Sequence, residues 1–106
     1  MSYLEQLFSL KGKLAVVTGG SRGLGRGMAE ALLGAGAEVI LVSADRDRLQ
    51  AATAELRAEG LKASSCRCDL QSAPEIDRLC RFVAEEHGCL DVLVNAAGVT
   101  TGWNDV

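Results

Sequence analysis

The sequence Thr18-Gly19-Gly20-Ser21-Arg22-Gly23-Leu24-Gly25 is the most informative part of this chain, because it is a glycine-rich turn between a strand-like and a helix-like segment. Residues 14–17 before it are a short, partly β-branched apolar run, which predicts a buried strand. Residues 26–33 after it are typical of a helix. In such a turn the backbone N–H groups point outward at the positive end of the helix dipole, which favours a phosphate or pyrophosphate.

The glycine spacing separates this turn from two commoner nucleotide-binding motifs. Residues 19–25 form Gly-x-x-x-Gly-x-Gly, and Met28 stands where the commoner dinucleotide fingerprint would place its third glycine. A P-loop is excluded because residues 26–27 are Arg-Gly, where that motif requires Lys followed by Ser or Thr. The turn therefore favours a dinucleotide over a nucleoside triphosphate.

Strand-like and helix-like segments alternate along the rest of the chain and are joined by short loops. With right-handed crossovers, this order predicts an α/β fold, a doubly wound parallel sheet in three α/β/α layers. Because the glycine turn follows the first strand, we expect the Rossmann-like strand order 3-2-1-4. We expect a single dinucleotide-binding domain over residues 1–106, with residues 1–12 as an N-terminal leader. The strands are expected at residues 13–18, 38–43, 62–69 and 90–95.

Each predicted helix has an apolar face, and two of them have a recognisable N-cap. Asp45 or Asp47 is expected to cap the second helix, and Ser72-Ala73-Pro74-Glu75 is a capping box with proline in the first turn of the third. The side chains expected to face the core are Met28, Ala31 and Leu32 of the first helix, Leu49, Ala52 and Leu56 of the second, and Ile76, Leu79, Cys80 and Val83 of the third.

Composition and charge exclude several classes of protein. The chain has 106 residues, of which 48% are hydrophobic and 24% charged, as in a folded globular protein. Its net charge of −3, with both signs interspersed, favours neither nucleic acid nor an anionic membrane as a partner. Residues 1–8 lack the pattern of a signal peptide, and no apolar run is long enough to span a bilayer. We therefore expect a cytoplasmic protein.

The four cysteines predict no metal site. Cys66, Cys68, Cys80 and Cys89 fall on predicted strands and a helix, and no Cys-x-x-Cys motif occurs. Cys66 and Cys68 share one face of a strand. We expect reduced thiols that serve as small core residues.

Three motifs at the carboxyl ends of predicted strands resemble those of the short-chain dehydrogenase/reductases. They are the glycine turn, Asp69-Leu70 and Asn95-Ala96-Ala97-Gly98, and the resemblance covers residues 8–98. It implies an NAD(P)-dependent oxidoreductase that transfers hydride between nicotinamide and a small-molecule carbonyl or alcohol. The residues for which it implies cofactor contacts are Gly19, Ser21, Arg22, Gly23, Leu24, Gly25, Ser43, Ala44, Asp45, Asp69, Leu70, Asn95, Ala96, Ala97 and Gly98.

The resemblance also implies individual roles. Asp69 would accept a hydrogen bond from the adenine amino group, although an aspartate there also suits a turn before Ser72. Asn95 would tie the fourth strand to the glycine turn through Thr18, and residues 96–98 would line a ribose. The family often has a second asparagine where this chain has Ala96, and differences of this kind are common among its members.

The residues near the second strand favour NADP over NAD. In the family an acidic residue that ends this strand grips the ribose 2′-hydroxyl of NAD, and here that position is Ser43. Ala44 stands where an arginine often binds NADP, and Asp45 is one residue further on, from where it could still turn toward the ribose. Ser21 and Arg22 in the glycine turn suit a 2′-phosphate, so NADP is the preferred cofactor and NAD the alternative.

The catalytic pair of the family, Tyr-x-x-x-Lys, is not in this sequence, whose only tyrosine is Tyr3. We expect the chain to be the cofactor-binding half of an oxidoreductase, without the C-terminal catalytic portion. The alternative is a catalytically silent NAD(P)-binding module that senses the cofactor or pairs with a partner. The apolar edge of the fourth strand predicts a homo-oligomer or dependence on a C-terminal half.

Overall fold

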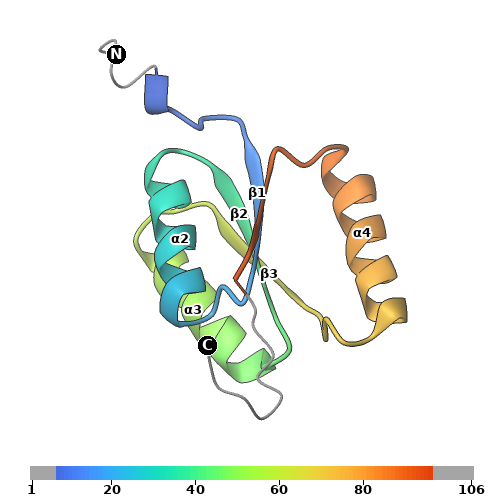
Figure 1. The fold of residues 1–106 in the computed structure, drawn as a ribbon. Coiled ribbons are helices and arrows are strands. Elements are labelled where there is room, and N and C mark those ends of the chain that lie inside the picture. Colours follow the sequence, from blue (N-terminus) through green and yellow to red (C-terminus); the bar gives the residue numbers. More distant parts are fainter. Residues whose placement is uncertain (1–6, 97–106) are drawn as a thin grey trace, which may run out of the picture.

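Four parallel strands form one sheet in the computed structural model, which describes residues 7–96 (Figure 1). The spatial order is β3-β2-β1-β4, and each neighbouring pair is parallel, which confirms the predicted order 3-2-1-4. The predicted third strand is too long at its carboxyl end, because the chain turns away from the sheet after Arg67. The strands are β1 (Leu14–Thr18), β2 (Glu38–Ser43), β3 (Ala63–Arg67) and β4 (Val92–Asn95).

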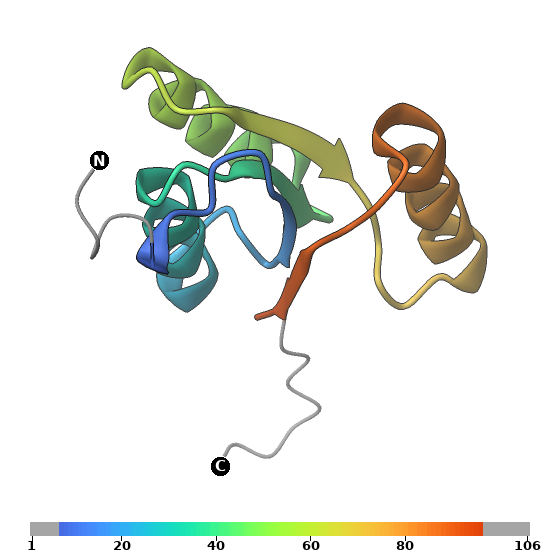
Figure 2. The ribbon, with the colours of Figure 1, turned by 90° about the horizontal axis from the view of Figure 1, so that it is seen from above.

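Helices cover both faces of the sheet, as predicted. Figures 1 and 2 show α2 (Gly23–Gly34) and α3 (Arg46–Ala58) on one side, with α4 (Ala73–His87) on the other. Successive residues of β1 enter different cores: Val17 packs with the α2 and α3 layer, whereas Val16 packs with Leu79 and Val83 of α4. All of β1 is buried, as a parallel strand between two helical layers should be.

The buried face of α2 agrees with the prediction only in part. Of the three predicted residues, Leu32 is half-buried and packs against the core, whereas Met28 is 39% exposed and Ala31 is also exposed. The fully buried side chains are those of Ala29 and Leu33. The helix begins in the glycine turn, where Gly25 is buried as well, so the contact stripe runs Gly25, Ala29, Leu33 at i, i+4 and i+8. Two of these three residues, Gly25 and Ala29, are small, so a pattern of large apolar residues does not reveal their part of the contact.

The other two helices follow the sequence more closely. In α3 the predicted inward residues Leu49, Ala52 and Leu56 are all buried. In α4 only Leu79 and Val83 are buried, and Ile76 and Cys80 are exposed, contrary to expectation. The apolar stripe of α4 is wider than the part of the sheet that covers it. An apolar groove of about 560 Å³ therefore remains beside β4.

Strand β4 is an edge strand within the described residues, where it pairs only with β1. Its Leu93 side chain is 63% exposed. Cys89, which precedes the strand, is exposed too. The expectation of core thiols is therefore confirmed for Cys68, holds in part for the half-buried Cys66, and is wrong for Cys80 and Cys89. No helix in residues 7–96 is long and apolar enough to cross a membrane.

A matched pair of substitutions tests the rotation of α2. Ala29→Leu should destabilise the protein by about 1–3 kcal/mol, because the added atoms enter a packed core. Ala31→Leu introduces the same side chain on the exposed face and should change stability by less than about 0.5 kcal/mol. Urea unfolding followed by circular dichroism measures both. Equal effects would contradict the assigned face.

Candidate cofactor site

A cavity of about 500 Å³ opens at the carboxyl ends of the strands. Most of the predicted site residues lie on its wall, contributed by the glycine turn and by the loops that follow β2, β3 and β4. Ala97 and Gly98 lie outside the described residues. The lining residues are Gly19, Ser21, Arg22, Gly23, Leu24, Gly25, Val42, Ser43, Ala44, Asp45, Cys68, Asp69, Leu70, Gln71 and Ala96.

The glycine turn owes its shape to two backbone requirements. Gly19 and Gly23 have φ of 70° and 58°, a left-handed conformation that favours glycine. A Cβ on Gly25 would collide with the carbonyl group of Gly19, so the first turn of α2 rests directly on the backbone that leaves β1. The Gly19 N–H also donates to the Val42 carbonyl at 2.7 Å, which ties the turn to the end of β2. The N-terminus of α2 is thereby fixed at the cavity wall.

The predicted contact between Asn95 and Thr18 is present. Thr18 Oγ1 donates to Asn95 Oδ1 at 2.8 Å, and the Ala96 N–H donates to the Thr18 carbonyl at 3.2 Å. These bonds join the ends of β4 and β1, where the register pairs Thr18 with Asn95. Asn95 itself faces the apolar groove beside α4 and not the cavity, so any direct contact with a cofactor stays a prediction.

The Asp45 carboxylate caps the N-terminus of helix α3. Its Oδ1 accepts the Arg48 N–H at 3.1 Å, and its Oδ2 lies 3.9 Å from the Arg48 guanidinium Nε. Of the two predicted N-caps, the structure therefore selects Asp45. Ser43 Oγ accepts the Asp45 N–H at 3.2 Å and the Ser21 hydroxyl at 3.5 Å. The end of β2 therefore carries the hydroxyl groups of Ser21 and Ser43, and position 43 itself is not an acidic residue.

Asp69 forms a local turn before Ser72, which was the structural alternative to a role in binding adenine. Its Oδ1 accepts the Gln71 N–H at 2.9 Å, and its carbonyl accepts the Ser72 N–H at 3.0 Å. The residue also lines the cavity, together with Leu70. A carboxylate has two oxygens and about four acceptor positions, so a bond within the turn leaves it able to accept a hydrogen bond from adenine.

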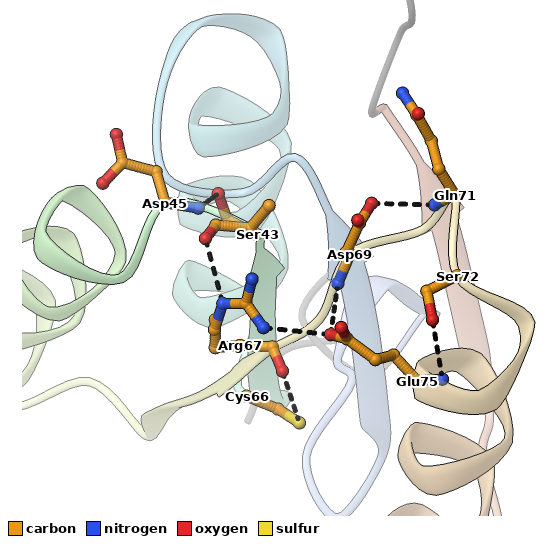
Figure 3. Close-up of polar contacts among 9 residues, drawn as sticks. Ser43, Asp45, Cys66, Arg67, Asp69, Gln71, Ser72 and Glu75 are labelled. Carbon is orange, nitrogen blue, oxygen red and sulfur yellow. Dashed lines mark hydrogen bonds and ion pairs between the residues drawn. The ribbon is translucent and has the colours of Figure 1, made fainter.

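The capping box of α4 forms only in part. The Ser72 hydroxyl accepts the Glu75 N–H at 3.4 Å, as predicted. The Glu75 carboxylate, however, accepts the Asp69 N–H at 2.9 Å and pairs with the Arg67 guanidinium at 3.0 Å (Figure 3). The main-chain turn already satisfies the Ser72 N–H, which leaves Glu75 available to hold the loop before the helix.

Sequence reasoning missed three residues of the cavity wall, which are Val42, Cys68 and Gln71. Each is next to a predicted residue, so position at a strand end is the only signal that could have found them. Cys68 is buried, and this burial raises the pKa of its thiol above the ordinary value, with a smaller contribution from Cys66. The thiol is therefore neutral at physiological pH and adds no negative charge to the cavity wall.

The charged group best placed for an anion is Arg22. It is the N-cap residue of α2, is exposed, and lines the cavity together with Ser21 and Ser43. Across residues 7–96 no three His, Cys, Asp or Glu side chains gather in a way that could hold a metal ion. Backbone N–H groups at a helix N-terminus and an arginine suit the phosphates of a dinucleotide.

A parallel sheet in the order 3-2-1-4, with a glycine turn after its first strand, defines a Rossmann-like nucleotide-binding domain. The family model described as short chain dehydrogenase matches residues 13–105. The chain belongs to the short-chain dehydrogenase/reductase family, a family of oxidoreductases.

Individual relatives agree with this assignment. Gluconate 5-dehydrogenase of Gluconobacter oxydans is 39% identical over 93 residues, which are 88% of this chain and 36% of that protein. A metagenomic short-chain oxidoreductase solved with NADP superposes with a TM-score of 0.81 at 44% identity, over 85% of this chain and 41% of the other. The Pseudomonas aeruginosa RhlG/NADP complex gives a TM-score of 0.81 at 40% identity, over 87% and 37%. The chain spans about a third of the length of most of the curated relatives it matches, and 7% of a longer one.

Two glycine substitutions in α2 test the backbone contact at the cavity. Gly25→Ala should destabilise the protein by about 1–3 kcal/mol, because its methyl group collides with the Gly19 carbonyl. Gly27→Ala, two residues away, meets no atom within 4 Å and should stabilise the exposed helix by roughly 0.5–1 kcal/mol. Thermal unfolding compares the two variants. A Gly25→Ala protein as stable as Gly27→Ala would show that the turn is not closed by this contact.

Proposed function

We propose that this chain holds NADP(H) for hydride transfer between the nicotinamide ring and a small-molecule carbonyl or alcohol. The observation that carries the proposal is the glycine turn, which presents the N-terminus of α2 to a cavity shared with the ends of β2 and β3. In α/β sheets, ligands bind in the crevice at the carboxyl ends of the strands. Membership in a family of dehydrogenases supports the reaction type.

Each wall of the cavity has a part in holding the dinucleotide. The backbone N–H groups of residues 19–25 take the pyrophosphate, where the helix dipole favours negative charge. Asp69 and Leu70 contact the adenine ring, and residues 43–45 contact the ribose attached to the adenine. The resemblance to the family implies that residues 96–98 line a ribose of the cofactor.

The charges at the end of β2 favour NADP over NAD. NAD selection needs a carboxylate that accepts a hydrogen bond from the ribose 2′-hydroxyl, but that position is Ser43 and the Asp45 carboxylate caps α3. The hydroxyl groups of Ser21 and Ser43 and the guanidinium of Arg22 are suitable donors for a 2′-phosphate. Two of the structural relatives were solved with NADP, which supports a nicotinamide dinucleotide as the ligand of this cavity.

The chain binds and orients the cofactor, and the cofactor itself supplies the hydride. Proton transfer in this family falls to a Tyr-x-x-x-Lys pair, and these 106 residues contain none. We therefore assign to this chain the cofactor-binding part of the reaction, and no residue within it is assigned as general acid or base.

Replacing Arg22 tests the cofactor preference. The intact protein should bind NADPH more tightly than NADH, and Arg22→Ala should weaken NADPH binding about tenfold by removing a charge-assisted contact with the 2′-phosphate. NADH binding should change little. Calorimetric titration measures both, with Arg57→Ala as control because Arg57 lies in the last turn of α3 and not at the cavity. Tighter binding of NADH by the unmodified protein would refute the NADP assignment.

Ser43 offers the opposite test, a change of preference toward NAD. Ser43→Asp places a carboxylate beside the ribose, so NADPH binding should weaken at least tenfold through repulsion of the 2′-phosphate, while NADH binding should strengthen. Ser43→Asn has a similar size but no charge and serves as the control. If both substitutions weaken NADPH equally, the effect is steric, and the end of β2 does not select the cofactor by charge.

A further inference from the structure

The side chains of Arg67 and Glu75, which lie outside the cavity lining, connect two opposite walls of the cavity. Arg67 is the last residue of β3, and Glu75 lies in the first turn of α4 (Figure 3). Arg67 Nε donates to the Ala44 carbonyl at 3.2 Å, and Arg67 Nη1 donates to Glu75 Oε1 at 3.0 Å. The same Glu75 oxygen accepts the Asp69 N–H at 2.9 Å. Contacts thus run without a break from the loop after β2 to the loop after β3.

The hydrogen bonds of Arg67 and Glu75 lie just beyond the point where the main-chain pairing between β2 and β3 ends. The register pairs Ser43 with Arg67, and one further main-chain bond follows, from the Cys68 N–H to the Ser43 carbonyl at 3.0 Å. Beyond it the chain enters α3 on one face of the sheet and turns toward α4 on the other. Within residues 7–96, Arg67 provides the side-chain hydrogen bond that joins the two loops past this point.

We propose that Arg67 and Glu75 act as a clamp that positions the two walls of the adenosine half of the cavity. One wall is Ala44 and Asp45, and the other is Asp69 and Leu70. Neither Arg67 nor Glu75 lines the cavity, so both are positioning residues and not ligands of the cofactor. The inference rests on the proposed function, because it assumes that this half receives an adenine nucleotide.

The chemistry of arginine suits this task. The planar guanidinium group donates from Nε toward one loop and from Nη1 toward the other, which the point charge of a lysine ammonium cannot reproduce. Arg67 also balances the charge of Glu75, which would otherwise stand unpaired close to a site for phosphates. The Arg67 side chain is 41% exposed, so its effect on binding is expected to be modest.

The test compares Arg67→Gln with Arg81→Gln in the otherwise unchanged protein. Arg81 pairs with Asp77 on the exposed face of α4 and is the matched control. Calorimetry measures binding of 2′,5′-ADP and of NADPH. Arg67→Gln should weaken both by the same factor, about fivefold, because the whole loss arises in the adenosine half. Arg81→Gln should weaken neither, and Arg67→Lys should fall between Arg67→Gln and the unmodified protein.

A second readout needs no ligand. Amide hydrogen exchange at Asp45 and Asp69 should be faster in Arg67→Gln than in Arg81→Gln, because the loops lose their common anchor. Unchanged exchange, or unchanged binding of 2′,5′-ADP, would overturn the clamp. A larger loss for NADPH than for 2′,5′-ADP would also overturn it, since the damage would then extend beyond the adenosine half. Faster exchange in a protein whose unmodified form binds neither ligand would support the clamp and refute the proposed function.

Discussion

The close approach of Gly25 to the carbonyl group of Gly19 positions helix α2 on the sheet. Because no side chain separates the two backbones, α2 can begin immediately above the end of β1. The same contact sets the rotation of the helix, so that Ala29 and Leu33 face the sheet. It also leaves the N-terminus of α2 open to the cavity, with Arg22 at the N-cap. One steric requirement therefore shapes both the core and the candidate site.

Polar side chains at the carboxyl ends of the strands serve the fold and the site together. Asp45 caps α3, and Asp69 holds the turn that leads into α4, although both line the cavity. The Asp45 carboxylate also lies beside the Arg48 guanidinium, which partly offsets its negative charge at the cavity wall. The character of that end of the cavity is then set by the hydroxyl groups of Ser21 and Ser43 and by the Arg22 guanidinium.

The reliability of sequence patterns varied with the residues that make each contact. The face of α3 was predicted correctly because large side chains, Leu49 and Leu56, carry it. For α2 the prediction was correct for Leu32 but wrong for Met28 and Ala31, since Gly25 and Ala29 make much of that contact and small residues leave little trace in an apolar pattern. For α4 the pattern was right about the helix but too wide, because Ile76 lies beyond the part of the sheet that covers it.

The order of strands and helices, the strand order of the sheet and the three motifs at the strand ends can all be recognised in the amino-acid sequence. They follow from local periodicity, from glycine spacing and from the handedness of crossovers. The contacts of Arg67 with Ala44 and Glu75, and the places of Cys68 and Gln71 on the cavity wall, emerge only when the chain is folded. They depend on register, because β3 lies beside β2 with Arg67 opposite Ser43, and no local pattern specifies which residues two neighbouring strands bring together.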